Sequence, residues 1–343
     1  MNEARVTTEP IRPDVVAPVS GRVARRRRAG LAAPWRAGLA VLIVLGLGGW
    51  GLTSPDLSSV KIVSTVLMYV ALAEAWNLLG GYAGYVNFGS VIFLGLGAYT
   101  TAILSVSTGW TPLATAPLAG LVAAGGALLI AVPAFRLRGD YFAVATFVLT
   151  LALQQLATVL GFTGGAFGRF LPTTLSSLDG AVRLFFVLFL VLAVLSVLTC
   201  FLLERSRWFS ALVAIREDED AAEVLGVPTL IIKVALLAGG ALIAGLAGCI
   251  YAAQLGYIEP TGTFDFRVSL AVVVGVVLGG MGTWYGPVVG AAIAELISQE
   301  LFTRVQGVWD QMAFGALLIV VVLVAPRGLA VLTRRRSGRR FGV

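Results

Sequence analysis

Long apolar windows restrict this chain more than any other feature, because they predict a protein that folds in lipid. A transmembrane helix needs about 17–25 consecutive, mainly apolar residues. Only 13% of the residues are charged and the mean hydropathy is +0.92, whereas a typical soluble domain has about 25% charged residues. The sequence therefore predicts an all-α, polytopic transmembrane helical bundle of about ten spans. The ten windows are residues 37–52, 62–80, 86–104, 113–134, 141–162, 183–203, 234–254, 267–284, 286–302 and 312–326.

Basic residues are distributed unevenly between these windows. With ten spans and a cytoplasmic N-terminus, 20 of the 25 Lys and Arg residues fall in cytoplasmic segments, as the positive-inside rule requires. We therefore expect an even number of spans, with both termini in the cytoplasm. Eight spans would have the same parity if one hairpin were re-entrant. The glycine-rich windows 86–104 and 286–302 are the candidates for a broken or re-entrant segment.

The two ends of the chain differ from its apolar centre. Residues 1–36 are rich in proline and arginine, which predicts a disordered, basic cytoplasmic tail. No clear small-residue cleavage motif follows its basic cluster, so we expect an uncleaved anchor rather than a signal peptide. Residues 37–326 form the predicted transmembrane domain, and residues 327–343 a second basic cytoplasmic tail.

Missing residue types argue against several kinds of chemistry. The chain has no histidine, which excludes serine–histidine catalysis and most zinc sites. Cys200 and Cys249 lie inside apolar windows, where a thiol behaves as a small hydrophobic group. Neither Lys61 nor Lys233 follows a glycine, so the chain has no G-x-x-x-x-G-K-[ST] phosphate loop. We expect no catalytic residue, metal or cofactor here, and we attribute the net charge of +7 to membrane flanks rather than to nucleic-acid binding.

The longest polar interruption between windows is the loop of residues 204–233, which is cytoplasmic in this topology. Its middle predicts one amphipathic helix that ends at Gly226 and Pro228. Acidic side chains crowd residues 217–223, whereas helices that lie on lipid usually carry Lys and Arg. The pattern therefore favours docking in the groove of a partner protein over a plain connector. The apolar face consists of Trp208, Leu212, Ile215, Ala222 and Leu225.

Four segments resemble the permease subunits of branched-chain amino acid ABC importers (LivM-type). In the loop, Asp220-Ala221-Ala222-x-x-x-Gly226 is similar to the E-A-A-x-x-x-G motif of bacterial ABC importer permeases, with Asp in place of Glu. Two features depart from the family pattern: Ser90 stands where a histidine is common, and the I-x-L-P continuation of the general motif is absent. The other similar segments are LAEAWNLLGGYAGYVNFGSVIFLGLGAYT (72–100), LRGDYFAVATFVL (137–149) and VVLGGMGTWYGPVVGAAI (276–293).

The resemblance implies one subunit of a heteromeric importer in the bacterial plasma (inner) membrane. The chain would pair with a sister permease, with two cytoplasmic ATPases that bind ATP and Mg, and with an extracytoplasmic substrate-binding protein. Leucine-type amino acids are the family's usual substrates, and other amino acids, urea or short amides stay open. The residues that would couple to an ATPase are Arg216, Glu217, Asp220, Ala221, Ala222 and Gly226.

Polar residues inside the windows are the candidates for the translocation path. Glu74 and Glu295 lie deep in their windows, where a carboxylate costs roughly 3 kcal/mol unless it faces protein or water. With Asn77, Asn87 and Ser90 they either border the path or form interhelical hydrogen bonds at subunit contacts. Two similar glycine-rich turns, 79–84 and 278–282, are either breaks beside the path or tight hairpins between closely packed helices.

A self-sufficient secondary transporter or channel for a small polar solute is the alternative function. Such a protein needs its own ion-coupling groups, and carboxylates are few in these windows. An integral membrane enzyme is disfavoured because histidine and clustered aspartates are missing, and a structural scaffold would not need the acidic stretch 217–223.

Overall fold

The structure, a computed structural model, describes residues 34–172 and 177–304. Most of the predicted N-terminal tail, the predicted window 312–326 and the C-terminal tail lie outside the described residues. The contacts divide the chain into two units, with the boundary after Gly49. Within the described residues the first unit holds only the beginning of α2 (Pro34–Thr53), and the second unit holds all the other elements.

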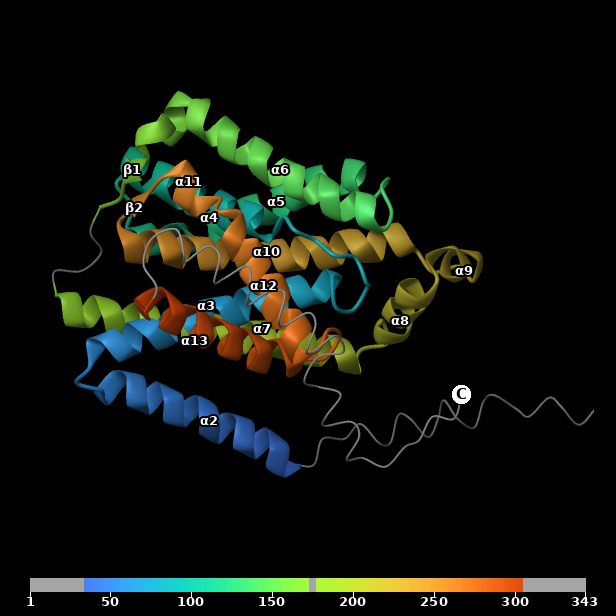
Figure 1. Cartoon of the computed structure of the whole chain (residues 1–343), viewed down its shortest axis with the longest axis horizontal. Helices are drawn as coiled ribbons and strands as arrows, with labels where there is room; N and C mark the ends of the chain where they lie inside the picture. Colours follow the sequence, from blue (N-terminus) through green and yellow to red (C-terminus); the bar gives the residue numbers. More distant parts are fainter. Residues whose placement is uncertain (1–33, 173–176, 305–343) are drawn as a thin grey trace, which may run out of the picture. The chain divides into compact units, whose positions relative to one another are not determined.

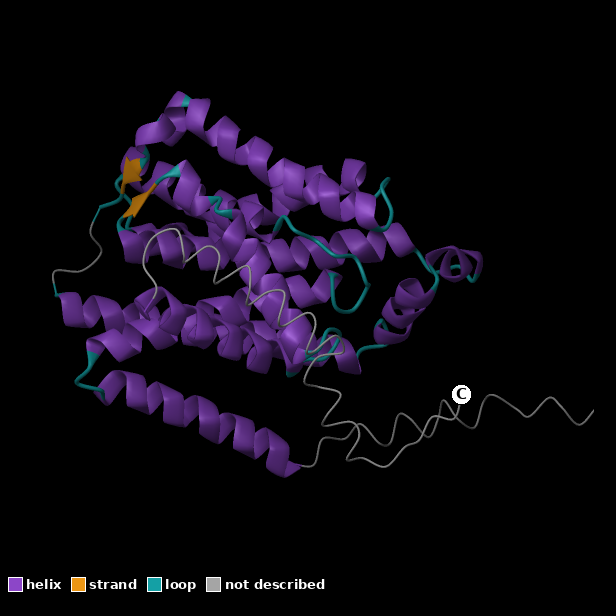
Figure 2. Ribbon diagram, in the orientation of Figure 1, coloured by secondary structure: helices purple, strands orange, loops and turns teal. Residues whose placement is uncertain are grey.

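The described part of the second unit is almost entirely helical (Figures 1 and 2). Its long helices are α3 (Leu57–Leu79), α4 (Ser90–Thr108), α5 (Ala116–Ala134), α6 (Asp140–Val159), α7 (Leu178–Arg205), α10 (Thr229–Leu255), α12 (Phe266–Gly279) and α13 (Gly286–Arg304). Its short helices are η2 (Pro112–Thr115), η3 (Gly161–Thr163), η4 (Gly165–Phe167), α8 (Phe209–Glu217), α9 (Glu219–Val224) and α11 (Pro260–Thr263). Strands β1 (Arg169–Phe170) and β2 (Tyr257–Ile258) pair antiparallel, with Arg169 opposite Ile258.

These elements confirm the predicted helical membrane fold. Seven helices in the described part are long and apolar enough to cross a membrane. Helices also cover the predicted windows 37–52 and 286–302, as α2 and α13. The total of ten spans and the side on which the termini lie stay predictions. The predicted window 86–104 contains one continuous helix that begins at Ser90, so its irregular part lies before the helix rather than inside it.

Local capping explains where several helices begin and end. Asp56 accepts a hydrogen bond from the Ser58 amide before α3, and Asp265 accepts one from the Arg267 amide before α12. Such caps satisfy amides that have no partner inside the helix. Helices α4 and α10 end at glycines with left-handed backbone, Gly109 and Gly256, which residues with a Cβ rarely adopt.

Connections at the two ends of the second unit differ in character. One end carries α8 and α9, together with the end of α7 and the beginning of α10 (Figure 1). The opposite end carries the β1–β2 ribbon and α11 (Figures 1 and 2). The acidic loop therefore lies at one end of the helices.

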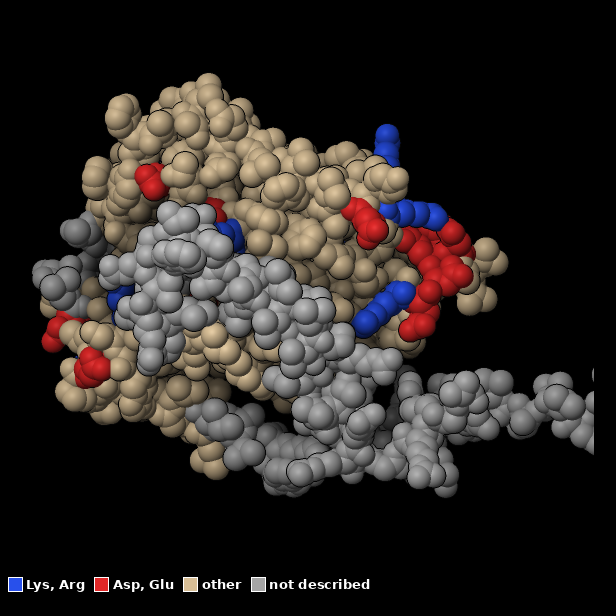
Figure 3. Space-filling model, in the orientation of Figure 1, with Lys and Arg blue, Asp and Glu red and all other residues tan. Residues whose placement is uncertain are grey.

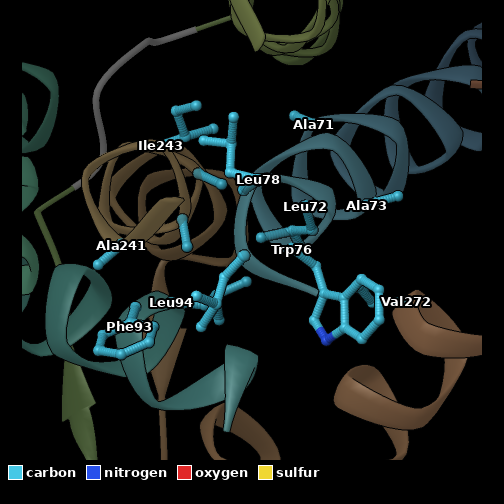
Figure 4. Close-up of a cluster of buried hydrophobic side chains, with 14 of the residues drawn as sticks. Ala71, Leu72, Ala73, Trp76, Leu78, Phe93, Leu94, Ala241, Ile243 and Val272 are labelled. Atoms are coloured by element: carbon cyan, nitrogen blue, oxygen red, sulfur yellow. The ribbon is translucent and has the colours of Figure 1, made fainter. Parts of the chain in front are cut away.

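The core surrounds α3, whose second half is almost completely buried. Trp76 and its neighbours pack against side chains of α4, α10 and α12 (Figure 4). A helix enclosed on all sides is mainly apolar all round, as the buried half of α3 is except for Glu74 and Asn77. The labelled core residues in Figure 4 are Ala71, Leu72, Ala73, Trp76, Leu78, Phe93, Leu94, Ala241, Ile243 and Val272.

Helix α10 approaches three neighbours closely because it presents glycines to their backbones. A Cβ on Gly240 would overlap the Ala75 carbonyl of α3, and a Cβ on Gly248 would overlap the Leu94 carbonyl of α4. A Cβ on Gly245 would collide with Ala123 of α5. Small residues at such crossings let helix backbones make the extensive van der Waals contact that stabilises membrane helices in lipid.

Replacing Gly248 by alanine should therefore destabilise the fold. The new methyl group meets the backbone of α4, which cannot rotate away, so we expect a loss of about 1–3 kcal/mol in the free energy of unfolding. Gly125→Ala is the matched control, because nothing lies within 4 Å of a Cβ built at Gly125, and alanine favours helix there. Thermal unfolding in detergent tests this. Equal melting temperatures for the two variants would contradict the close approach of α4 and α10.

Candidate functional site

The loop between α7 and α10 contains two short helices, not the single amphipathic helix predicted from sequence. Asp218 has an extended backbone and separates α8 from α9. Its side chain accepts a hydrogen bond from the Ala221 amide at 3.0 Å, so it serves as the N-cap of α9. A short acidic side chain can satisfy free amides better as a cap than inside a helix, and this explains the break.

The break also divides the predicted apolar face. Leu212, Ile215 and Ala222 are buried as expected, but Trp208 and Leu225 are exposed. Val224, which sequence reasoning did not single out, is 88% exposed beside Leu225 at 81%. The end of α9 thus presents two large apolar side chains to the outside, next to the left-handed Gly226.

The structure separates the six predicted coupling residues into two groups. Glu217, Asp220, Ala221 and Gly226 are exposed on the loop, where Figure 3 shows a dense patch of acidic side chains. Ala222 is buried. Arg216 is also exposed, but its guanidinium reaches back to the helices, where Nη1 donates a hydrogen bond to the Gly81 carbonyl at 2.9 Å.

One acidic residue of this stretch turns inward and joins a buried cluster. Glu219 forms an ion pair with Lys233, whose side chain is only 3% exposed, and accepts hydrogen bonds from the Tyr85 hydroxyl and from Thr229. Burial raises the pKa of Glu219, but the hydrogen bonds from Lys233 and Tyr85 and the charge of Lys233 outweigh it, so its pKa is lowered overall. Through this cluster, Glu219 connects α9 to Lys233 of α10 and to Tyr85 in the segment before α4.

Aromatic rings complete the surroundings of the Lys233 ammonium group. Its Nζ lies 4.6 Å from the centre of the Tyr85 ring and 5.1 Å from that of Phe135, within the range of cation–π attraction. A second ion pair between Arg138 and Asp220 ties α9 to the turn before α6. Its side chains are 60% and 71% exposed, so it stabilises far less than a buried pair.

The five predicted path residues are all buried, but they do not form one site. Asn87 and Ser90 line a cavity of about 20 Å³ between α3, α4 and α10. Asn77 binds the turn before α13, and Glu295 accepts a hydrogen bond from Gln299 at 2.8 Å. For Glu74, no hydrogen bond with another described residue reaches either carboxylate oxygen.

The cavity combines apolar walls with few polar groups. Trp76, Phe93 and Gly240 contribute to its wall, and the Trp76 indole donates to the Asn87 carbonyl at 2.5 Å. The Ser90 hydroxyl is buried without a hydrogen-bond partner among the described residues. A cavity of this size has room for a water molecule.

Together, the buried helices, the acidic loop at one end and the cavity between helices define a polytopic membrane permease. The chain matches the family model described as "Branched-chain amino acid transport system / permease component" over residues 58–322. It therefore belongs to this family of transport permease components.

Individual relatives agree with the family assignment. The chain is 32% identical over 315 residues to the high-affinity branched-chain amino acid transport system permease protein LivM of Salmonella typhimurium, covering 83% of this chain and 72% of the relative. It is 31% identical to LivM of Escherichia coli K12, with 80% and 71% covered. It is also 28% identical to the autoinducer 2 import system permease protein LsrC of Salmonella typhi, with 56% and 57% covered. No solved structure matches the chain.

Replacing Lys233 by methionine should destabilise the protein, because Glu219 then stays buried without its cation. Removal of one partner from a buried pair costs about 3–5 kcal/mol, and the partial exposure of Glu219 (13%) puts the expected loss near the lower end. The double variant Lys233→Met/Glu219→Gln should recover part of this loss. Arg138→Ala, which breaks the exposed pair, should change little. Thermal unfolding compares the variants; a Lys233→Met protein as stable as Arg138→Ala would contradict the role of the cluster.

Proposed function

We propose that this chain is the membrane permease subunit of an importer for branched-chain or related amino acids, driven by ATP hydrolysis on partner chains. The observation that carries the proposal is the α8–α9 loop, in which outward-facing acidic and apolar side chains adjoin inward-facing contacts to the helices. A coupling element needs both faces, since it must bind a partner and also move the helices. The sequence has no phosphate loop of its own, so the ATPase is a separate protein.

The complete assembly we propose contains this chain, a sister permease, two cytoplasmic ATPases and an extracytoplasmic substrate-binding protein in the bacterial inner membrane. This chain then has ten spans and both termini in the cytoplasm, on the side of α8 and α9. The distribution of basic residues supports that orientation. Membrane relatives named as branched-chain amino acid transport permeases support the substrate class.

The exposed part of the loop is the proposed docking surface for an ATPase. Val224 and Leu225 provide apolar side chains for a groove, and Glu217, Asp220 and Glu223 surround them with negative charge. This combination suits helix-in-groove binding, in which apolar anchors supply affinity and the charges set orientation. Anionic lipid would repel the same surface.

The cavity beside Asn87 and Ser90 is the proposed part of the translocation path. A cavity of about 20 Å³ has room for a water molecule rather than an amino acid, so the described conformation is closed at this point. Passage requires α10 to move away from α3 and α4. Alternating access thus consists of opening this contact toward one side of the membrane and then the other, in step with the partner ATPases.

Replacing residues 220–226 with a glycine–serine linker of equal length should abolish ATPase binding. The linker lacks both the apolar anchors and the charges, so we expect co-purified ATPase to fall by at least about tenfold. The control is the same replacement at residues 161–167, which lie at the opposite end of the helices. Transport and ATPase binding that survive the exchange at 220–226 would refute the docking surface.

Filling the cavity should block transport without affecting ATPase binding. In Ser90→Leu the larger side chain occupies the space beside Asn87, so uptake of labelled leucine into proteoliposomes should fall by about tenfold or more. Ser107→Leu is the matched control, since Ser107 is exposed near the other end of the same helix. Equal uptake by the two variants would place the path elsewhere.

A further inference from the structure

Two glycine-rich turns that are far apart in the sequence lie against each other at the α8–α9 end. The first turn is residues 80–84, between α3 and α4, and the second turn is residues 280–284, between α12 and α13. Asn77, in the last turn of α3 just before the first turn, binds the second turn through both polar atoms of its side-chain amide. Its Nδ2 donates to the Thr283 carbonyl at 3.1 Å, and its Oδ1 accepts from the Gly282 amide at 3.0 Å.

Glu204, in the last turn of α7, binds one residue of each turn. The Tyr82 hydroxyl donates to its Oε1 at 2.9 Å, and the Trp284 amide donates to the same oxygen at 2.7 Å. Hydrogen bonds to a charged acceptor are stronger than those between neutral groups. One carboxylate at the base of the loop therefore holds the first and second turns together.

Arg216, at the end of α8, is placed between the same two turns. Besides its hydrogen bond to the Gly81 carbonyl, its Nη1 would lie 2.7 Å from a Cβ on Gly282, and its Cγ 3.1 Å from a Cβ on Gly84. Both glycines have positive φ, +80° at Gly84 and +72° at Gly282. Glycine at these positions permits the turn conformation and leaves space for the arginine side chain.

We propose that Arg216 and Glu204 are positioning residues that carry movements of α8 to both glycine turns at once. This proposal rests on the proposed function, because it assumes that an ATPase moves the loop. The first turn connects α3 to α4 and the second connects α12 to α13, so a shift of α8 displaces four helices together. Arg216 is itself exposed, but its guanidinium contacts the first turn, so in this proposal it acts on the turns rather than on the ATPase.

The test uses the complete complex in proteoliposomes, with ATP hydrolysis and uptake of labelled leucine measured on the same sample. For Arg216→Ala we expect normal co-purification of the ATPase and continued hydrolysis, but about tenfold less leucine transported per ATP. Arg216→Lys keeps the positive charge and a group that can donate a hydrogen bond, so it should recover part of the ratio of leucine transported to ATP hydrolysed. Arg207→Ala is the matched control, because Arg207, like Arg216, is an exposed arginine of the same loop, but its guanidinium lies over the Trp208 ring.

Glu204 supplies a second, independent pair of variants. Glu204→Gln retains an oxygen that can accept from Tyr82 and Trp284 and should transport nearly normally, whereas Glu204→Ala should lower the ratio as Arg216→Ala does. This pair decides the question if Arg216 variants do not fold, as judged by thermal unfolding.

The outcomes separate this proposal from the proposed function. A ratio for Arg216→Ala equal to that of Arg207→Ala, or equal ratios for the two Glu204 variants, would overturn the positioning role. Loss of ATPase co-purification in Arg216→Ala would overturn it as well, by placing the arginine at the ATPase surface, and would leave the proposed function standing. An unaltered chain that transports leucine without any ATPase would refute the proposed function itself.

Discussion

Close backbone packing of α10 against α3, α4 and α5 is the constraint on which the rest of the second unit depends. Lipid chains are as apolar as a protein interior, so helices in a membrane associate mainly through van der Waals contact and interhelical hydrogen bonds. Gly240, Gly245 and Gly248 permit that contact. The position of α10 then determines where Lys233 can meet Glu219 and where Gly240 borders the cavity.

The α8–α9 loop has two faces because its short helices meet two different environments. Toward the helices, Ala222 is buried, Glu219 is paired, and Arg216 reaches Gly81. Toward the outside, Val224 and Leu225 are exposed among acidic side chains. In the function proposed above, movement imposed on the outer face would reach the helices through these inner contacts, and the polar cluster and the two turns would connect docking to the opening of the cavity.

Sequence reasoning succeeded where the signal is local. Apolar windows located the helices, and the acidic stretch with its glycine stop located the loop. It was wrong about a single helix across Asp218, because the periodic spacing of apolar residues continues through a residue that prefers to cap. It also grouped Asn77 with Asn87 and Ser90, which are close in sequence, although Asn77 binds Thr283 while the other two line the cavity.

The sequence by itself determined that this chain is a helical membrane protein, which segments are helical and where the long polar loop lies, because these properties follow from the polarity of consecutive residues. Only the tertiary structure decided which face of each helix is buried and which loop residues turn inward. In a membrane, the side of a helix that faces lipid can be as apolar as the side that faces other helices, so hydrophobic periodicity does not identify the buried side. Contacts such as that between Asn77 and Gly282 depend on how the helices pack around α3.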